Sequence, residues 1–294
     1  MSQYQRLLLI IDPTFRHSQA IQQAAALAKA SGASLHVAAL VPAIKGLWML
    51  EERDRAQLCE DCLRPHRDWL KEQTDPLRDR EIAVTTQVAW AKDLEQDIID
   101  YVSDMQPDLL IKQIQHESAF KRAIFTPLDW HLLRHCPVPV YLLGGSSHVL
   151  PRKVVAAVEV TDVEPADNAL NERIIKQACG LAMQCNAELH LLYACAISAA
   201  YLADCDGLTL AELTKALGTD LQKAFLKLAG QFGVPSDRRH FIEGHPVAVL
   251  SEFAHDHQVD VIVMGKVQSR GMGKLLGSTT EHILYQVPCC VLAV

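Results

Sequence analysis

Four of the chain's 14 glycines lie within 13 residues near the C-terminal end, in the stretch MGKVQSRGMGKLLGSTTEHIL (264–284). They are Gly265, Gly271, Gly273 and Gly277. Ser278 and Thr279 follow the last glycine, ahead of a helical pattern. Glycines let backbone N–H groups approach phosphate oxygens closely, and a helix N-terminus adds free donors and the positive end of the helix dipole. The stretch therefore predicts an anion site of the kind that holds a phosphate group.

The stretch is not a Walker phosphate loop. That motif needs Gly-Lys followed by Ser or Thr, whereas Gly273-Lys274 is followed by Leu275. The alternative is an ordinary glycine-rich turn between a strand and a helix, capped by Ser or Thr. The residue types alone leave both interpretations open.

A second group of chemically active side chains lies in CEDCLRPH (59–66). Cys59, Cys62 and His66 stand at i, i+3 and i+7, so on a helix all three share one face. Two thiolates and an imidazole can hold zinc. No second ligand pair stands nearby, and the alternative is a pair of reduced thiols on an amphipathic helix.

Histidines and nucleophiles elsewhere give weaker indications. His255 and His257 point roughly 200° apart on a helix, so they cannot easily share one ion, and a solvated helix face is expected. His36 and His190 recur at matching strand positions, which indicates a structural role or a shared pocket wall. The sequence holds no Ser/His/Asp elbow and no nucleophile with a base at a diagnostic spacing, so we predict no enzymatic activity.

The elements that position these residues belong to an internal sequence repeat. Four segments of the first half recur in the second half in the same order, 147 to 154 residues later. The pairs are RLLLIID (6–12) with KVVAAVE (153–159), GASLHVAAL (32–40) with NAELHLLYA (186–194), PDLLIK (107–112) with VDVIVMG (259–265), and LLRHCPVPVYLL (132–143) with ILYQVPCCVLAV (283–294). The repeat predicts one folding unit, duplicated.

Each half alternates short apolar runs with helical periodicity, which predicts an α/β fold with a five-stranded parallel sheet and helices on both faces. The expected strands are 6–12, 34–41, 81–88, 108–112 and 138–143, then 153–159, 187–194, 239–243, 260–264 and 289–294. The expected domains are 1–147 and 151–294, and the polar stretch GGSSHVLPR (144–152) is the expected linker.

Helices are expected between the first two strands of each half. Their buried stripes are Ile21, Ala24, Ala25 and Ala28 in the first half and Leu170, Ile174, Ala178, Leu181 and Cys185 in the second. Gly32 and Asn186 stand just past these helices, and both residue types tolerate the left-handed conformation that ends a helix.

A ligand of an open parallel sheet binds at the carboxyl ends of the strands, where the winding direction reverses. With five strands in a doubly wound order, this crevice lies between the first and fourth strands. The loops of interest therefore follow Asp12 and Lys112 in the first half, and Glu159 and Gly265 in the second.

The composition excludes some classes of partner. With 294 residues and a net charge of −7, the chain has room for two domains and shows no basic patch, so we predict no nucleic-acid binding. No apolar run approaches the ~20 residues of a membrane span, so we predict no membrane contact. No signal sequence is evident, and nine scattered cysteines suit a reducing compartment, so a cytoplasmic protein is expected.

The duplicated pattern resembles the universal stress proteins in tandem form. The first half resembles the E-type members in particular, through IFTPLDWHLLRHCPVPV (124–140). EGHPVAVL (243–250) also resembles the family's Gly-x-Pro turn after the third strand. The resemblance implies two Rossmann-like domains of the adenine nucleotide alpha hydrolase-like type, and it covers residues 4 to 294.

Nucleotide-binding members of that family hold ATP with magnesium through Gly-x2-Gly-x9-Gly-(Ser/Thr) after the fourth strand and an Asp after the first. Carried over, Gly265 fills the first position, Gly277-Ser278 fills the last, and Glu159 replaces the Asp. Gln268 occupies the second glycine, and the segment before Gly277 is one residue short. The implied cofactor-binding residues are Glu159, Met264, Gly265, Gly271, Gly277, Ser278 and Thr279.

The first half departs further from the family pattern. LIKQIQHESAFKRAIFTPLDW contains no glycine, and Pro127 stands where Ser278 stands in the second half. Because proline has no N–H to offer a phosphate, this half is not expected to bind ATP in the family manner. Thr126 and Asp129 instead suggest a helix cap.

The resemblance implies a non-enzymatic stress-response protein. In the family such duplication replaces a dimer of single domains, so an intramolecular pseudo-dimer is expected, with a further homodimer left open. The alternative is a scaffold whose crevice receives an apolar or lipid-like small molecule, nucleotide binding having been lost. Apolar connections in 41–70, with Leu47, Trp48, Met49 and Leu50, and in 195–213 motivate it.

Overall fold

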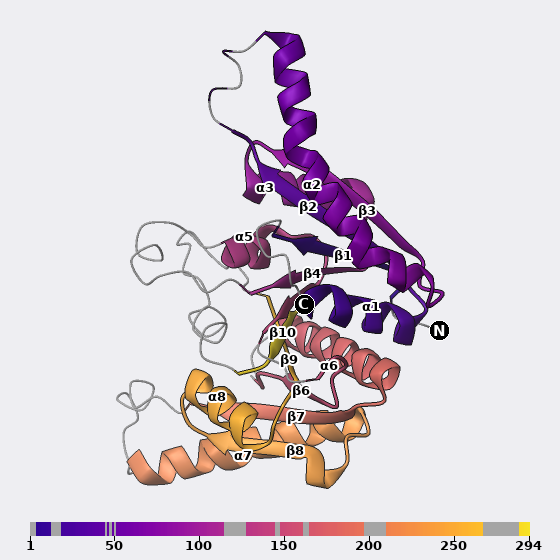
Figure 1. Ribbon diagram of the computed structural model, residues 1–294. Helices are drawn as coiled ribbons and strands as arrows, with labels where there is room; N and C mark the ends of the chain where they lie inside the picture. The colour runs from indigo at the N-terminus through magenta and orange to yellow at the C-terminus, as the bar shows by residue number, and fades with distance from the viewer. Residues whose placement is uncertain are drawn as a thin grey trace. The chain divides into compact units, whose positions relative to one another are not determined.

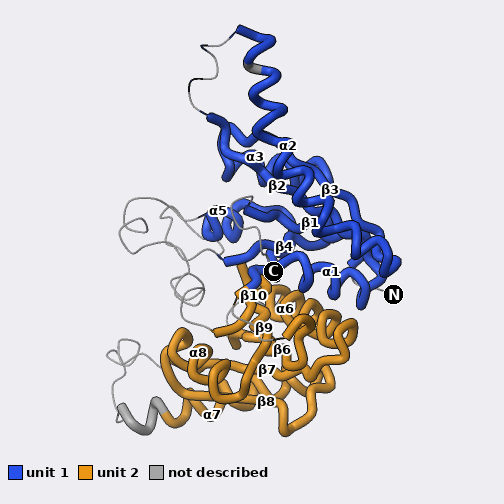
Figure 2. Tube along the Cα trace, viewed as in Figure 1, with its two compact units in different colours: residues 1–143 blue, residues 144–294 orange. Residues whose placement is uncertain are grey.

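A computed structural model describes residues 4–12, 19–44, 46, 49, 51–114, 128–144, 148–160, 165–196, 210–266 and 288–294. The chain divides into two compact units, Met1–Leu143 and Gly144–Val294, here unit 1 and unit 2 (Figure 2). The division falls at the first residue of the stretch GGSSHVLPR (144–152). No helix in the described part of the chain is long and apolar enough to cross a membrane.

Unit 1 carries parallel strands in the order β3-β2-β1-β4-β5 (Figure 1). The strands are β1 (Arg6–Ile11), β2 (Ser34–Pro42), β3 (Val84–Ala91), β4 (Leu109–Gln113) and β5 (Val140–Leu143). The helices of its described part are α1 (Gln19–Ser31), α2 (Glu52–Arg78), α3 (Leu94–Met105) and α5 (Leu128–His135).

Unit 2 repeats this arrangement, with parallel strands in the order β8-β7-β6-β9-β10. The strands are β6 (Lys153–Ala157), β7 (Glu188–Cys195), β8 (Arg239–Glu243), β9 (Val261–Met264) and β10 (Cys290–Ala293). The helices of its described part are α6 (Pro165–Cys185), α7 (Leu210–Gln231) and α8 (Pro246–Asp256), and a short 3-10 helix spans Ser236–Arg238. The matching strand orders confirm the duplicated α/β fold.

The central strands form the core of each unit. Leu7, Leu8 and Leu9 of β1 are fully buried, as are Val154 and Val155 of β6. Since successive side chains of a strand point to opposite faces, consecutive buried residues mean that both faces of the sheet are covered. This explains why the strands appear in the sequence as near-continuous apolar runs.

The predicted helix stripes are confirmed where they face the sheet. Ile21, Ala24, Ala25 and Ala28 of α1 are all buried, and so are Ile174, Ala178 and Leu181 of α6. Leu170 and Cys185, at the two ends of the stripe on α6, are only partly buried. Gly32 and Asn186 take φ of 70° and 52°, the left-handed conformation that their residue types predicted.

β3 begins three residues later than the expected strand 81–88, and α2 explains the shift. The helix extends to Arg78, and Glu81 then takes φ of 63°, so the chain turns before it can enter the sheet. α2 occupies much of the connection after β2, where the sequence suggested an amphipathic helix around Cys59–His66, and it packs against β3.

One carboxylate ties the amino ends of the two central strands in each unit. In unit 1 the backbone N–H groups of Gln5 and Arg6 donate to Asp108 Oδ2, at 2.7 and 2.8 Å. In unit 2 those of Arg152 and Lys153 donate to Asp260 Oδ2, at 2.8 and 3.1 Å. The repeat thus preserves a polar tie as well as an apolar pattern.

Candidate functional site

The carboxyl ends of β6 and β9 form the candidate site in unit 2. β6 pairs with both β7 and β9, so the winding direction reverses between β6 and β9, as predicted. Ala156 lies opposite Val263 in this parallel pair, which places Glu159, two residues past β6, at the same edge as Gly265, one residue past β9.

The backbone of Glu159 is held from α6. Its N–H donates to Asn171 Oδ1 at 3.2 Å, and Asn171 Nδ2 donates to its carbonyl at 2.6 Å. Asn171 is 4% exposed, whereas Glu159 is exposed. The buried amide therefore fixes the loop after β6 and leaves the carboxylate in solvent, where it can meet a cation or a hydroxyl group.

Gly265 lies where α6 approaches β9 closely. A Cβ atom at this position would come within 2.9 Å of Leu170 Cδ2. Met264, just before it, is buried, and the N–H of Lys266, just after it, donates to the Val294 carbonyl at 2.8 Å. Close packing of α6 against β9 therefore explains glycine at this position.

The rest of the predicted phosphate cradle lies outside the described residues. Gly271, Gly277, Ser278 and Thr279 belong to the segment 267–287, which the structure does not describe. Of the predicted cofactor-binding residues, the structure brings together Glu159, Met264 and Gly265.

Two further side chains support this edge and were missed by sequence reasoning. Asn171 is one of them, and its signal was a polar residue beside the apolar stripe of α6. Tyr193 of β7 is the other, and its hydroxyl donates to the Val160 carbonyl at 3.4 Å. Burial raises the pKa of Tyr193, so the phenol stays a neutral donor.

The equivalent edge of unit 1 holds a buried ion pair. Lys112, in β4, and Asp129, in the first turn of α5, lie 2.6 Å apart from Nζ to Oδ1. Their side chains are 5% and 3% exposed. Lys112 Nζ also donates to the Gln113 carbonyl at 3.1 Å. The protein thus supplies its own anion at the carboxyl end of β4.

The ion pair marks the main difference between the two edges. In the repeat, Lys112 corresponds to Met264, and Asp129 corresponds to Thr280. The sequence suggested that Asp129 belongs to a helix cap with Thr126, but its carboxylate instead pairs with Lys112. Thr126 and Pro127 lie outside the described residues.

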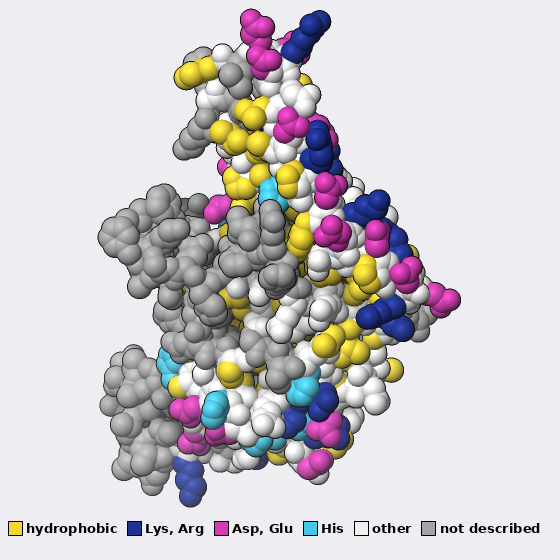
Figure 3. Space-filling view, in the orientation of Figure 1, with side chains coloured by type: hydrophobic (Ala, Val, Ile, Leu, Met, Phe, Trp, Pro, Cys, Tyr) yellow, Lys and Arg dark blue, Asp and Glu magenta, His cyan; other side chains and the backbone are white. Residues whose placement is uncertain are grey.

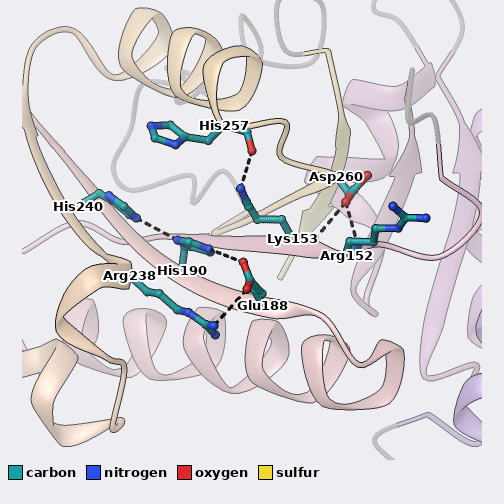
Figure 4. A network of polar contacts seen from close by, with 8 residues as sticks. All are labelled: Arg152, Lys153, Glu188, His190, Arg238, His240, His257 and Asp260. Atoms are coloured by element: carbon teal, nitrogen blue, oxygen red, sulfur yellow. Dashed lines mark hydrogen bonds and ion pairs between the residues drawn. The ribbon is translucent and has the colours of Figure 1, made fainter.

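A histidine network lies toward the opposite, amino end of the unit 2 strands (Figure 4). His190 Nδ1 lies 3.0 Å from His240 Nε2, and the two rings stack with centroids 5.3 Å apart. The His257 ring lies 5.9 Å from His240, and the His257 carbonyl accepts from Lys153 Nζ at 2.7 Å. In unit 1, the matching His36 bonds to Thr85 and Tyr101 instead.

Burial favours the neutral form of two of these imidazoles, His190 and His240. Burial, followed by the nearby His190, His257 and Lys153, lowers the pKa of His240 to about 4. Burial also lowers the pKa of His190, and the Glu188 carboxylate, 3.5 Å from its Nε2, acts in the opposite direction. Both histidines therefore join cross-strand packing rather than the ligand crevice.

We expect acid to destabilise unit 2 through His240. Its pKa is about 4 in the folded chain and about 6.5 in an unfolded one, so the unfolded state binds more protons between these values. The contribution of neutral His240 to the free energy of unfolding is fully present above about pH 6.5 and is lost as the pH drops toward 4. Urea unfolding at pH 7.5, 6 and 5 measures this loss.

The variant His240→Gln isolates the contribution of the network. It keeps a hydrogen-bonding group beside His190 but does not titrate, so its stability should fall less between pH 7.5 and pH 5. His255→Gln is the matched control, because the His255 side chain is 80% exposed. Identical pH dependence of the native chain and His240→Gln would refute the assignment.

The structure places the candidate zinc ligands on one helix. Cys59, Cys62 and His66 lie on α2 and are all described, Cys59 and Cys62 being partly exposed free thiols. In the described part of the chain, no group of three or more His, Cys, Asp or Glu side chains is arranged to hold a metal ion. His255 and His257, on and just past α8, are exposed, as the sequence predicted.

Comparisons with known proteins agree with this fold. A family model described as "Universal stress protein family" matches residues 3–143 and 152–294. The chain is 27% identical over 305 residues to universal stress protein E of Escherichia coli (strain K12), covering 100% of this chain and 95% of that protein.

Two solved structures share the architecture. A putative universal stress protein from Pseudomonas aeruginosa UCBPP-PA14 superimposes with a TM-score of 0.73 and 24% identity, covering 99% of this chain and 93% of that one. A universal stress protein from Archaeoglobus fulgidus DSM 4304 gives a TM-score of 0.68 and 17% identity, covering 99% and 96%. At these identities the likeness establishes the fold alone.

Proposed function

The chain belongs to the universal stress protein family, and from this premise we propose that unit 2 binds a nucleotide such as ATP with magnesium, or another anionic small molecule. Binding takes place at the carboxyl ends of β6 and β9. The observation that carries the proposal is the buried pair of Lys112 and Asp129 in unit 1. In unit 1 the Asp129 carboxylate occupies this edge. Unit 2 has Met264 and Gly265 after the same point in the strand, so an incoming anion does not compete with a carboxylate of the protein paired to a residue there.

Glu159 and the glycine-rich segment have complementary tasks in this proposal. The exposed carboxylate of Glu159 binds magnesium or a ribose hydroxyl group, because its backbone is already fixed by Asn171. Backbone N–H groups at Gly277 and Ser278 bind the phosphates, since glycine permits close approach. Unit 1 then has a structural or regulatory task.

Titration of the full chain with ATP and magnesium tests the proposal. We expect calorimetric heat that saturates at or below millimolar nucleotide. Glu159→Gln should weaken the affinity about tenfold, because a hydrogen bond to a charged group is worth about 1.5–3 kcal/mol. Ser278→Pro should weaken the affinity further, because proline, which stands at the corresponding position 127 of the first half, has no N–H to donate.

The first half provides the matched control for this experiment. Asp12 follows β1 as Glu159 follows β6, so Asp12→Asn should leave the affinity unchanged if binding occurs in unit 2 alone. No heat at millimolar ATP, or an equal loss from both substitutions, would contradict the proposal. Unchanged ATP during prolonged incubation is the result expected of a protein without enzymatic activity.

We further propose that the protein acts in the cytoplasm during stress and that its duplication replaces a dimer of single domains. The family resemblance and the absence of a membrane-crossing helix in the described residues support this. Universal stress protein E of Escherichia coli, matched over 95% of its length, is the comparison that favours a stress role.

An apolar ligand is the second candidate, favoured by exposed side chains near the start of α2. Ile44, Met49 and Leu58 are 47%, 72% and 40% exposed. Leu47, Trp48 and Leu50 lie outside the described residues, as do 197–209 of the corresponding second-half connection. Native mass spectrometry of protein purified from cells should then show a bound adduct, and a clean mass of the bare chain would exclude it.

A further inference from the structure

The outer edge of β3 in unit 1 has no strand beside it in the described part of the chain. β3 pairs with β2 over eight residues, from Val84 to Ala91, and with no second described strand. Such a long free edge is normally blunted or covered, because its backbone groups can pair with another chain.

The hydrogen bonds to β2 identify the outward groups. The carbonyls of Ala83 and Ala91 accept from Leu35 and Ala43 on the β2 side, so odd-numbered residues of β3 direct their backbone groups to β2. Even-numbered residues direct theirs outward. The Val84 carbonyl agrees with this, since it accepts from Arg78 Nε of α2 at 3.3 Å.

Thr86 and Val88, the next residues whose backbone groups point outward, line a groove of about 440 Å³ between β3 and α2. Leu70 of α2, 1% exposed, also lines this β3–α2 groove, and so does Gln87. No hydrogen bond joins the outward backbone groups of Thr86 and Val88 to another described residue. The indole Nε1 of Trp90, the following even-numbered residue, is buried without a hydrogen-bond partner.

The rim of the groove is basic. Arg67, Lys71 and Arg78 line it, against the single acidic residue Asp68. Arg67 pairs with Glu60, and Arg78 pairs with Asp75, whereas Lys71 makes no ion pair with a described residue. On the face seen in Figure 3, basic and acidic side chains alternate along α2. Of the residues that line the groove, three are basic and one is acidic, and Lys71 is the basic one that has no ion pair with a described residue.

We propose that the β3–α2 groove receives an extended acidic segment of another protein, which adds a strand along β3. Strand addition satisfies the outward N–H and C=O groups of Thr86 and Val88. Acidic side chains on the face of the added strand that lies toward α2 pair with Lys71 and the neighbouring arginines. A second copy of this chain is disfavoured, because pairing two β3 edges brings two basic rims together.

Fluorescence polarisation with the full chain tests this with a defined probe, a fluorescein-labelled octapeptide of alternating Val and Glu. We expect saturable binding, weakened by 0.5 M NaCl because exposed charges are screened. The matched peptide of alternating Val and Lys should bind at least tenfold more weakly. The acidic peptide N-methylated at alternate residues should also lose at least tenfold, since it keeps its charge but cannot pair with the edge.

Two substitutions place the binding on the groove. The Val88 N–H points outward, so Val88→Pro preserves the ladder with β2 and removes a donor for the added strand, and a loss of at least tenfold is expected. Lys71→Glu should weaken binding comparably. Arg64→Glu is the control on the same helix, because Arg64 pairs with Asp61 and does not line the groove.

Three outcomes would overturn the proposal. One is the absence of binding at millimolar peptide. Another is equal binding of the N-methylated and the unmodified acidic peptides to the native chain, because this result indicates an anion site rather than strand addition. This test does not depend on whether Val88→Pro folds. The last is sedimentation equilibrium showing a dimer that Val88→Pro abolishes, because the occupant of the edge is then a second copy.

Discussion

We expect Lys112→Met to lower the free energy of unfolding of unit 1 by about 3–5 kcal/mol. Removing one partner of a buried ion pair leaves the other charge without compensation, and Asp129 is 2% exposed. Urea unfolding of the full chain, followed by hydrogen exchange at the amides of β1 and β4, measures the loss where it occurs. Methionine is chosen because Met264 occupies the corresponding position in the second half.

The double variant Lys112→Met/Asp129→Thr tests the reason for this effect. It installs the second-half residues at both positions, so no charge stays buried, and stability should return to within about 1 kcal/mol of the native chain. Lys223→Met is the exposed control, because Lys223 pairs with Asp220 on the surface with a 73% exposed side chain, and its loss should cost less than about 1 kcal/mol. Equal destabilisation of the single and double variants would show that packing, not charge, is responsible.

Asp260→Ala has the second largest expected effect, a loss of about 3 kcal/mol from unit 2. Its side chain is 6% exposed and accepts from the N–H groups of Arg152 and Lys153. His148 Nδ1 also lies 2.8 Å from its Oδ1. Removal leaves three partly buried donors without this acceptor, and an unsatisfied donor costs about 1–3 kcal/mol when no water reaches it. Urea unfolding at pH 7.5 measures the loss.

The repeat supplies an internal control for Asp260. Asp108 makes the same tie to Gln5 and Arg6 in unit 1 but is more exposed, so Asp108→Ala should cost less, about 1–2 kcal/mol. Asp260→Asn keeps an acceptor and should fall between Asp260→Ala and the native chain. If Asp108→Ala and Asp260→Ala prove equally costly, burial does not determine the strength of the tie.

His148 also changes how the stretch between the two units is understood. The polar composition of GGSSHVLPR (144–152) predicted a linker, but His148 and the Arg152 backbone are both held by Asp260. Part of this stretch is therefore a fixed element of unit 2. Polar composition carried no information about the buried carboxylate 112 residues further along the chain.

The sequence by itself determined the repeat, the strands and the helix stripes. Leu7 to Ile11 and their counterparts form strands because a strand covered on both faces must be apolar at every position, which is a local property. The stripe from Ile21 to Ala28 follows from the 3.6-residue helical period in the same way. Together with the rule that ligands bind where winding reverses, these patterns indicated the edge that carries Glu159 and Gly265.

Only the tertiary structure decided which polar groups meet. Lys112 and Asp129 are 17 residues apart, and His190 and His240 are 50 apart, with no periodic signal to join them. Such pairs depend on which strands become neighbours and in which register, and the free edge of β3 depends on the strand order. The physical reason is range: apolar periodicity acts within one element, whereas a hydrogen bond requires two distant elements to be placed within about 3 Å of each other.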